Sequence, residues 1–183
     1  MYRNEIYLQL IVDMKRSYGF DKKVEEAISL LVTHINSTGH NPKPVILHSI
    51  RVGISLYKRG YSEEIVLAGF LHDLLEDTSA SEGEIKNKFG ERVIELVLAN
   101  SYNENIENAE DRYNDTFRKC LKVGKDALIV KAADILDNLP YYSWPNDSYV
   151  TKKINSFIEL AKPVLDNDPI FEELIIKFEA ANS

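Results

Sequence analysis

The sequence contains a single cysteine, no long apolar run and no dense group of basic residues. Because Cys120 has no second cysteine to pair with, an internal disulfide is excluded and a reducing compartment is favoured. No stretch approaches the roughly 18 consecutive apolar residues that a membrane-spanning helix needs. Lysine and arginine total 22 against 29 aspartate and glutamate residues, without a basic run that could follow a phosphate backbone. We therefore expect a cytoplasmic protein that binds neither membranes nor nucleic acids.

The 183 residues are 44% hydrophobic, which is enough to build the core of a single domain over residues 1–183. Apolar residues recur at spacings of three and four, whereas alternation with period two, typical of strands, is not sustained. The pattern predicts an all-α bundle of about ten helices, with loops at the proline pair in 41–44 and in the polar segment 100–116. The expected helical segments are 6–14, 22–38 after Asp21 as N-cap, 45–58, 62–75, 81–90, 93–98, 117–123, 126–139, 149–165 and 169–180.

His72 stands out among the four histidines because Asp73 follows it inside an apolar run. A His-Asp pair among core residues needs partners, which either a metal ion or a hydrogen-bonded core would supply. Glu76 and Asp77 follow four residues after His72 and Asp73, so in a continuous helix all four side chains share one turn. Three acids and a histidine on one turn repel one another unless a cation or a catalytic role compensates. A solvated acidic helix end is the alternative, although acids are unfavourable at the negative end of a helix dipole.

A second polar group lies in the apolar segment 127–139. Lys131, Asp134 and Asn138 occupy positions i, i+3 and i+7, which places them on one face of the expected helix. Asp134 is therefore either an ion-pair partner of Lys131 or a metal ligand. His48 lies in a similar setting, because apolar residues flank it in the helix expected at 45–58.

The order of His48, the His72–Asp73 pair and Asp134 resembles the H…HD…D pattern of the HD-domain metal-dependent phosphohydrolases. Within that superfamily the sequence is similar to the RelA/SpoT-type (p)ppGpp hydrolase domain, including its small metazoan SpoT homologue. The resemblance covers about residues 22–140. It is carried by four strings: PVILH at Pro44–His48, HDLLEDT at His72–Thr78, IKNKFGERVIELV at Ile85–Val97 and VKAADILDNL at Val130–Leu139.

The resemblance implies a helical fold that binds one divalent metal ion, with Mn²⁺ favoured and Fe²⁺ or Zn²⁺ as alternatives. By their place in the pattern, the ligands would be His48, His72, Asp73 and Asp134. Two imidazoles and two carboxylates suit such borderline ions better than they suit Ca²⁺. No histidine follows His72, which favours a site for one ion rather than the two-metal site of the cyclic-nucleotide phosphodiesterases.

The same resemblance assigns roles around the ion. Glu76 and Asp77 would orient the attacking water and accept its proton. Asn138 matches an asparagine that contacts substrate in the family, and Lys131 is expected to bind substrate phosphate if Asp134 does not engage it.

The segment that binds the nucleotide in the family is altered here. The loop at residues 35–43 is short and holds one lysine, Val45 stands where a tyrosine is usual, and Pro140 replaces an arginine. We expect a small phosphorylated substrate, most specifically the 3′-pyrophosphate of guanosine-3′,5′-bis(diphosphate), with weak preference for guanine. The alternatives are a nucleotidase-like hydrolase of another small phosphorylated metabolite and a non-catalytic nucleotide-binding module. The sequence leads to no prediction of oligomeric state.

Overall fold

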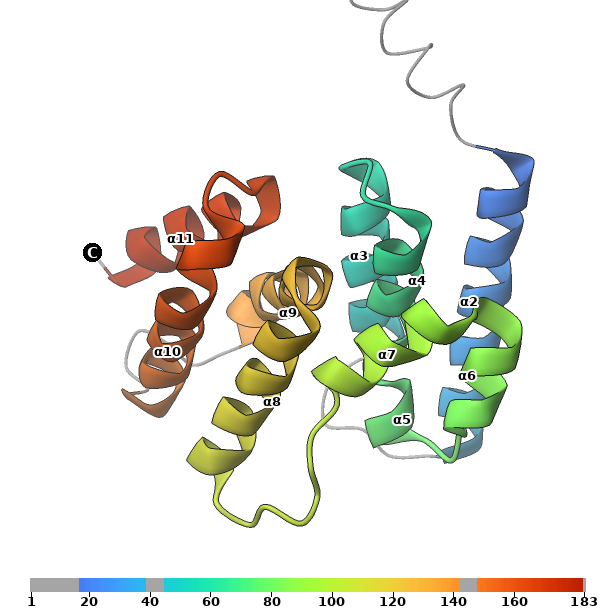
Figure 1. The fold of residues 1–183 in the computed structure, drawn as a ribbon, viewed down its shortest axis with the longest axis horizontal. Helices are drawn as coiled ribbons and strands as arrows, with labels where there is room; N and C mark the ends of the chain where they lie inside the picture. Colours follow the sequence, from blue (N-terminus) through green and yellow to red (C-terminus); the bar gives the residue numbers. More distant parts are fainter. Residues whose placement is uncertain (1–16, 39–44, 142–147, 183) are drawn as a thin grey trace, which may run out of the picture.

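The computed structural model describes residues 17–38, 45–141 and 148–182 (Figure 1). Within these ranges the regular structure is helical and contains no strand, so the all-α prediction is confirmed. The helix expected at 6–14 and the loop at 41–44 lie outside the described residues. The elements are α2 (Tyr18–Thr38), α3 (Val45–Lys58), α4 (Glu63–Leu71), α5 (Leu74–Asp77), α6 (Glu82–Phe89), α7 (Glu91–Asn100), α8 (Ala109–Val123), α9 (Lys125–Asn138), the 3-10 helix η1 (Leu139–Tyr141), α10 (Ser148–Leu165) and α11 (Pro169–Asn182).

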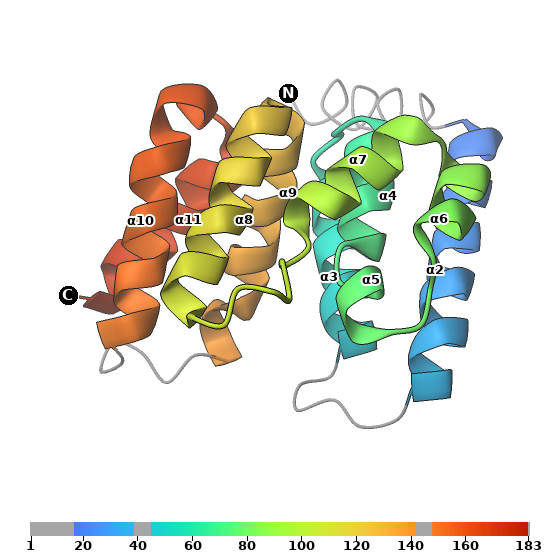
Figure 2. The same cartoon turned by 60° about the horizontal axis from the view of Figure 1, so that its bottom comes forward.

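Helix α9 runs between the two halves of the molecule (Figure 2). It packs against α3, α4 and α7 on one side and against α8, α10 and α11 on the other. The continuous stretch Ala127–Ala133 is buried, including the charged residue Lys131. A helix enclosed in this way is apolar nearly all round, so the polar side chains that it carries must find partners inside the fold. No helix of the described residues is both long and apolar enough to span a bilayer.

Helices α3 and α4 approach closely at two glycines. A Cβ atom at Gly53 would overlap the ring of Phe70, and one at Gly69 would lie 2.5 Å from a methyl carbon of Leu56. The absence of side chains therefore lets the two helices pack backbone against backbone. This contact brings the N-terminal half of α3 beside the C-terminal end of α4, the two segments that carry the candidate histidines.

The single helix predicted over 62–75 is wrong, because α4 ends at Leu71 and α5 begins at Leu74. The Nδ1 atom of His72 lies 2.9 Å from the carbonyl oxygen of Gly69, the acceptor that the amide of residue 73 would use in a continuous helix. The side chain thus competes with the helical hydrogen bond at this point. As a result, Asp73 stands between two helices instead of on the face of one.

Helix α8 begins at Ala109, about eight residues before the predicted start at 117. The side chain of Asn108 accepts hydrogen bonds from the amides of Glu110 (2.8 Å) and Asp111 (3.1 Å), and both acids lie in the positive first turn. The predicted loop is therefore confirmed over 101–108, whereas the polar residues from 109 to 116 form the capped and charged start of a helix. The boundary predicted between the next two helices is confirmed at Gly124, whose φ is 112°.

Candidate metal centre

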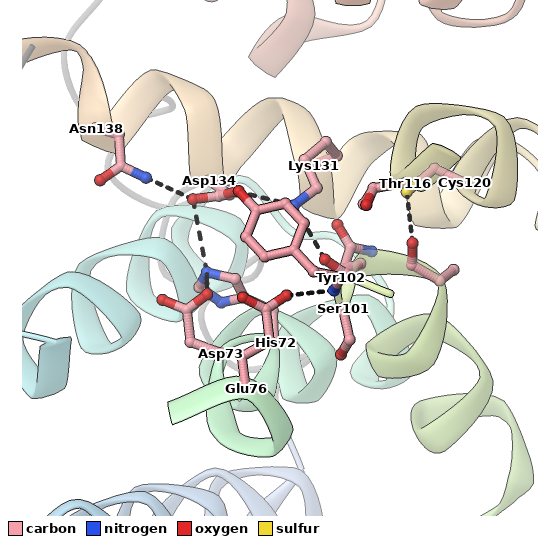
Figure 3. Close-up of polar contacts among 12 residues, drawn as sticks. His72, Asp73, Glu76, Ser101, Tyr102, Thr116, Cys120, Lys131, Asp134 and Asn138 are labelled. Atoms are coloured by element: carbon pink, nitrogen blue, oxygen red, sulfur yellow. Dashed lines mark hydrogen bonds and ion pairs between the residues drawn. The ribbon is translucent and has the colours of Figure 1, made fainter. Parts of the chain in front are cut away.

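Three helical segments place their polar side chains around one point. The Nε2 atom of His48, on α3, lies 3.2 Å from Nε2 of His72 and 3.2 Å from Oδ1 of Asp134, on α9. Oδ1 of Asp73 lies 3.2 Å from Nε2 of His72, and its Oδ2 lies 3.6 Å from Nε2 of His48. Both imidazoles are buried. We call these four residues, which the sequence singled out, the metal cluster; Figure 3 shows three of them.

The hydrogen bonds of the two imidazoles fit a bound cation. Nδ1 of His72 faces the carbonyl oxygen of Gly69, and Nδ1 of His48 lies 2.7 Å from a carboxylate oxygen of Asp137. A carbonyl or carboxylate oxygen can only accept, so each ring carries its proton at Nδ1 and, when neutral, turns a lone pair outward at Nε2. Two lone pairs 3.2 Å apart repel each other unless a cation, either a metal ion or a proton on one of the rings, lies between them. One donor atom each from His48, His72 and Asp134 lies within 4.8 Å of the others, a spacing at which they could hold a metal ion.

Asp137 binds the Nδ1 atom of His48, and Arg51 in turn binds Asp137. The sequence analysis missed both contacts. Nε and Nη2 of Arg51 each donate to a different oxygen of Asp137 at 2.8 Å, while Asp137 accepts from His48. Burial acts to raise the pKa of Asp137, but the hydrogen bonds from His48 and Arg51 outweigh it and hold that pKa below its usual value. The ionised carboxylate therefore fixes the orientation of the His48 ring.

Asp134 forms the ion pair with Lys131 and also turns its second carboxylate oxygen toward the imidazoles. Its Oδ2 accepts from Nζ of Lys131 at 3.0 Å, whereas Oδ1 faces the imidazoles and accepts from the Asn138 amide at 2.6 Å. Lys131 also donates to the carbonyl oxygen of Asn100 at 3.2 Å, so its ammonium group is engaged inside the protein and not open to substrate. Burial opposes charge on both groups, but their mutual attraction raises the pKa of Lys131 and lowers that of Asp134 well below the usual value.

Glu76 comes from α5 and lies beside the cluster (Figure 3). Its Oε1 accepts a hydrogen bond of 2.6 Å from the backbone amide of Tyr102. Burial, reinforced by the charge of Asp73 and opposed by that of Lys131, raises the pKa of Glu76 to about 7. A carboxyl group with such a pKa can exchange protons near neutral pH. Asp77, the other member of the predicted acidic pair, ends α5 and is partly buried.

Tyr102 is a second residue that the sequence analysis missed, because it lies in the segment read only as a polar loop. Its ring stands over the space between Glu76 and Asp134 (Figure 3). Tyr102 is 40% exposed, and desolvation, the largest cause, raises its pKa to about 12. A hollow of about 400 Å³ borders Glu76 and Tyr102, and its lining also includes Glu82 and Glu104. Those two carboxylates make the hollow unfavourable for an anion.

Two solved structures share the fold. One is described as a metazoan orthologue of SpoT that hydrolyses ppGpp and plays a role in starvation responses. It matches with a TM-score of 0.71 and 22% identity over 90% of this chain and 96% of that one. A Listeria monocytogenes protein matches with a TM-score of 0.64 and 24% identity over 80% of this chain and 100% of that one.

Two curated relatives are similar in sequence. The guanosine-3′,5′-bis(diphosphate) 3′-pyrophosphohydrolase of Aquifex aeolicus is 30% identical over 135 residues, which are 73% of this chain and 18% of that protein. A probable enzyme of the same name from Synechocystis is 32% identical over 111 residues, 58% of this chain and 15% of that protein. This chain thus spans less than a fifth of the length of these relatives. The profile of the HD domain matches residues 27–157, a range that contains the whole metal cluster. The chain therefore belongs to the HD domain family.

Proposed function

We propose that the chain is a metal-dependent phosphohydrolase whose ion is held by the metal cluster, His48, His72, Asp73 and Asp134. The observation that carries the proposal is the pair of buried imidazoles whose Nε2 atoms lie 3.2 Å apart while both ring protons are committed elsewhere. Two carboxylates complete a donor set that suits a borderline ion, and we favour Mn²⁺ over Fe²⁺ or Zn²⁺. When bound, the ion would supply Lewis-acid polarisation of the phosphate and activation of water.

The residues around the cluster have separate proposed roles in proton transfer and substrate binding. We propose that Glu76 accepts the proton of the attacking water, because its raised pKa lets the carboxylate act as a base near neutral pH. Asp77 is proposed to assist as the second acid of the pair. Asn138 uses one amide hydrogen on Asp134, and we propose that its second hydrogen contacts a substrate oxygen. Lys131 is proposed to act on substrate only through Asp134, which it orients.

As substrate we propose the 3′-pyrophosphate of guanosine-3′,5′-bis(diphosphate) or of a related nucleotide. The names of the relatives from Aquifex aeolicus and Synechocystis support this choice, and so does the carboxyl group of Glu76 beside the cluster. In the proposed reaction water adds to the phosphorus that is attached to the ribose 3′ oxygen, and the water proton passes to Glu76. The bond from that phosphorus to the 3′ oxygen breaks, the 3′ oxygen takes up a proton, and pyrophosphate and guanosine diphosphate are the products. We further propose that residues 1–183 act as one domain in a reducing, aqueous compartment.

The test is a product assay on the purified full chain with added Mn²⁺. We expect guanosine-3′,5′-bis(diphosphate) to yield guanosine diphosphate and pyrophosphate in equal amounts, and the Glu76→Gln variant to release both at least about 10²-fold more slowly. The adenine analogue and a panel of nucleoside monophosphates belong in the same screen. Release from a monophosphate alone would favour a nucleotidase, whereas tight nucleotide binding without any product would indicate a regulatory module.

A further inference from the structure

The metal cluster presents an anionic substrate with few positive charges. Asp73, Asp134 and Glu76 contribute three carboxyl groups, and the ammonium group of Lys131 is engaged by Asp134 and a backbone carbonyl. Arg51 is held by both oxygens of Asp137. A phosphate that reaches the cluster therefore needs hydrogen-bond donors beyond these residues and the ion.

Tyr102 offers one such donor at the open side of the cluster. Its backbone amide binds Glu76, so the position of the residue is fixed relative to the proposed base. The ring lies between Glu76 and Asp134 with its hydroxyl end toward Asp134 (Figure 3). Among the described residues, this hydroxyl has no hydrogen-bond partner, and 40% of the residue surface is exposed. The hydroxyl is thus an unused donor, within the described part of the chain, on a residue that a ligand can reach.

Arg112, in the first turns of α8, brings a positive charge to the same residue. The central carbon of its guanidinium group lies 5.7 Å from the centre of the Tyr102 ring, within the range of a cation–π contact. In the described part of the chain it forms no ion pair with a carboxylate, unlike Arg51. Its planar array of donors matches the oxygens of a phosphate. The hollow that borders Tyr102 is lined by Glu76, Glu82 and Glu104 but not by Arg112, so its carboxylates disfavour an anion there.

We propose that Tyr102 and Arg112 form a phosphate-binding edge of the site. The Tyr102 hydroxyl donates a hydrogen bond to an oxygen of the phosphate held at the cluster, and the Arg112 guanidinium compensates charge on that phosphate or on the next one. The edge adds, from loop 101–108 and α8, a cation for substrate recognition in a sequence whose segment 35–43 holds a single lysine. The identity of the substrate rests on the proposed function, but the edge itself requires only that the ligand is a phosphate anion.

The test measures phosphate binding separately from turnover. Full-length protein is loaded with one equivalent of Mn²⁺, freed of excess ion and titrated calorimetrically with inorganic phosphate. We expect Tyr102→Phe and Arg112→Gln each to weaken binding about 10-fold, which is typical of losing one hydrogen bond to a charged group. Both variants should retain one Mn²⁺ per chain, because neither residue belongs to the metal cluster.

Two matched substitutions control for the chemistry of the change. Tyr149→Phe removes a hydroxyl from a partly exposed tyrosine of α10, and Arg118→Gln removes a charge from the exposed part of α8. Neither should change phosphate affinity. Equal affinity in wild type, Tyr102→Phe and Arg112→Gln would overturn the proposal, as would loss in one of the two variants alone. If phosphate binding depends on both residues but no nucleotide is hydrolysed, the edge stands and the proposed function fails.

Discussion

The metal cluster differs from the neighbouring phosphate-binding edge, Tyr102 and Arg112, in how its polar groups are paired. In the cluster, each imidazole and Asp134 is fixed by a second group of the protein, as His48 is by Asp137. Along the edge, the Tyr102 hydroxyl and the Arg112 guanidinium have no hydrogen-bond or carboxylate partner among the described residues, and the adjacent Glu76 accepts from the Tyr102 backbone amide. The difference indicates that the cluster is organised before substrate arrives, whereas the edge becomes fully paired only when substrate is present.

Removing an imidazole should have the largest effect, because the site loses a metal ligand. Without the bound ion, Tyr102 and Arg112 alone cannot hold the substrate phosphate. We expect His72→Ala to lose Mn²⁺ binding and all measurable hydrolysis. Elemental analysis and a product assay on the same sample measure the two quantities. His34→Ala is the matched control, since His34 pairs with Glu84 between α2 and α6, away from the cluster. Wild-type activity in His72→Ala would contradict the role given to the cluster.

A substitution of Glu76, the proposed base, should lower turnover without lowering Mn²⁺ affinity. Glu76→Gln keeps the shape of the side chain and an oxygen that can accept from the Tyr102 amide, but it cannot take a proton. We expect turnover to fall about 10²- to 10⁴-fold with Mn²⁺ affinity close to that of wild type. Glu82→Gln, in the lining of the hollow, should leave both unchanged. Parallel losses of Mn²⁺ and turnover in Glu76→Gln would instead make Glu76 part of the cluster.

A smaller effect, on Mn²⁺ affinity, is expected from a substitution of Asp137, which binds His48. Asp137→Asn retains an acceptor for His48 but removes the negative charge that favours the Nδ1 proton and strengthens the Nε2 donor. We expect Mn²⁺ affinity to fall about 10-fold, at the lower end of the range typical of such supporting groups. Asp126→Asn is a matched control, because Asp126 lies on the same helix and pairs with Arg92 but contacts no histidine. Calorimetric titration with Mn²⁺ provides the comparison. Equal affinities of Asp137→Asn and Asp126→Asn would show that the charge of Asp137 does not contribute to Mn²⁺ binding.

The smallest effect concerns the stability of the metal-free protein. The folded-state pKa of Glu76, about 7, lies above the ordinary value of 4.5, so between these pH values the folded protein binds more protons than the unfolded chain. The free energy of unfolding therefore falls as pH rises from 4.5 to 7 and stays lowered above that range. Glu76→Gln cannot ionise, so it should be more stable than wild type at pH 8, by at most about 3 kcal/mol, and similar at pH 4. Denaturant titrations with chelator at both pH values measure this difference, and a pH-independent difference would contradict it.

The residues that sequence analysis predicted well are those whose partners lie in local patterns or family motifs. The bounds of α3 and the glycine break before α9 follow from periodicity and local backbone preference. All four members of the metal cluster come from motif residues that the fold brings together. The pairing of Arg51 with Asp137 connects α3 to α9 across 86 positions, and no local pattern indicates it. The position of Tyr102 likewise depends on a tertiary contact, its amide bond to Glu76, whereas the break at His72 comes from a local contact of its side chain with the Gly69 carbonyl that apolar periodicity does not reveal.

The most direct test of the central claim is to locate the ion itself. Crystals of the full chain grown with Mn²⁺ and measured at the manganese absorption edge would give an anomalous signal wherever the ion binds. We predict one peak per chain, about 2.0–2.6 Å from Nε2 of His48, Nε2 of His72 and the carboxylate oxygens of Asp73 and Asp134. A peak at another site, or none in crystals whose protein hydrolyses the nucleotide, would contradict the account.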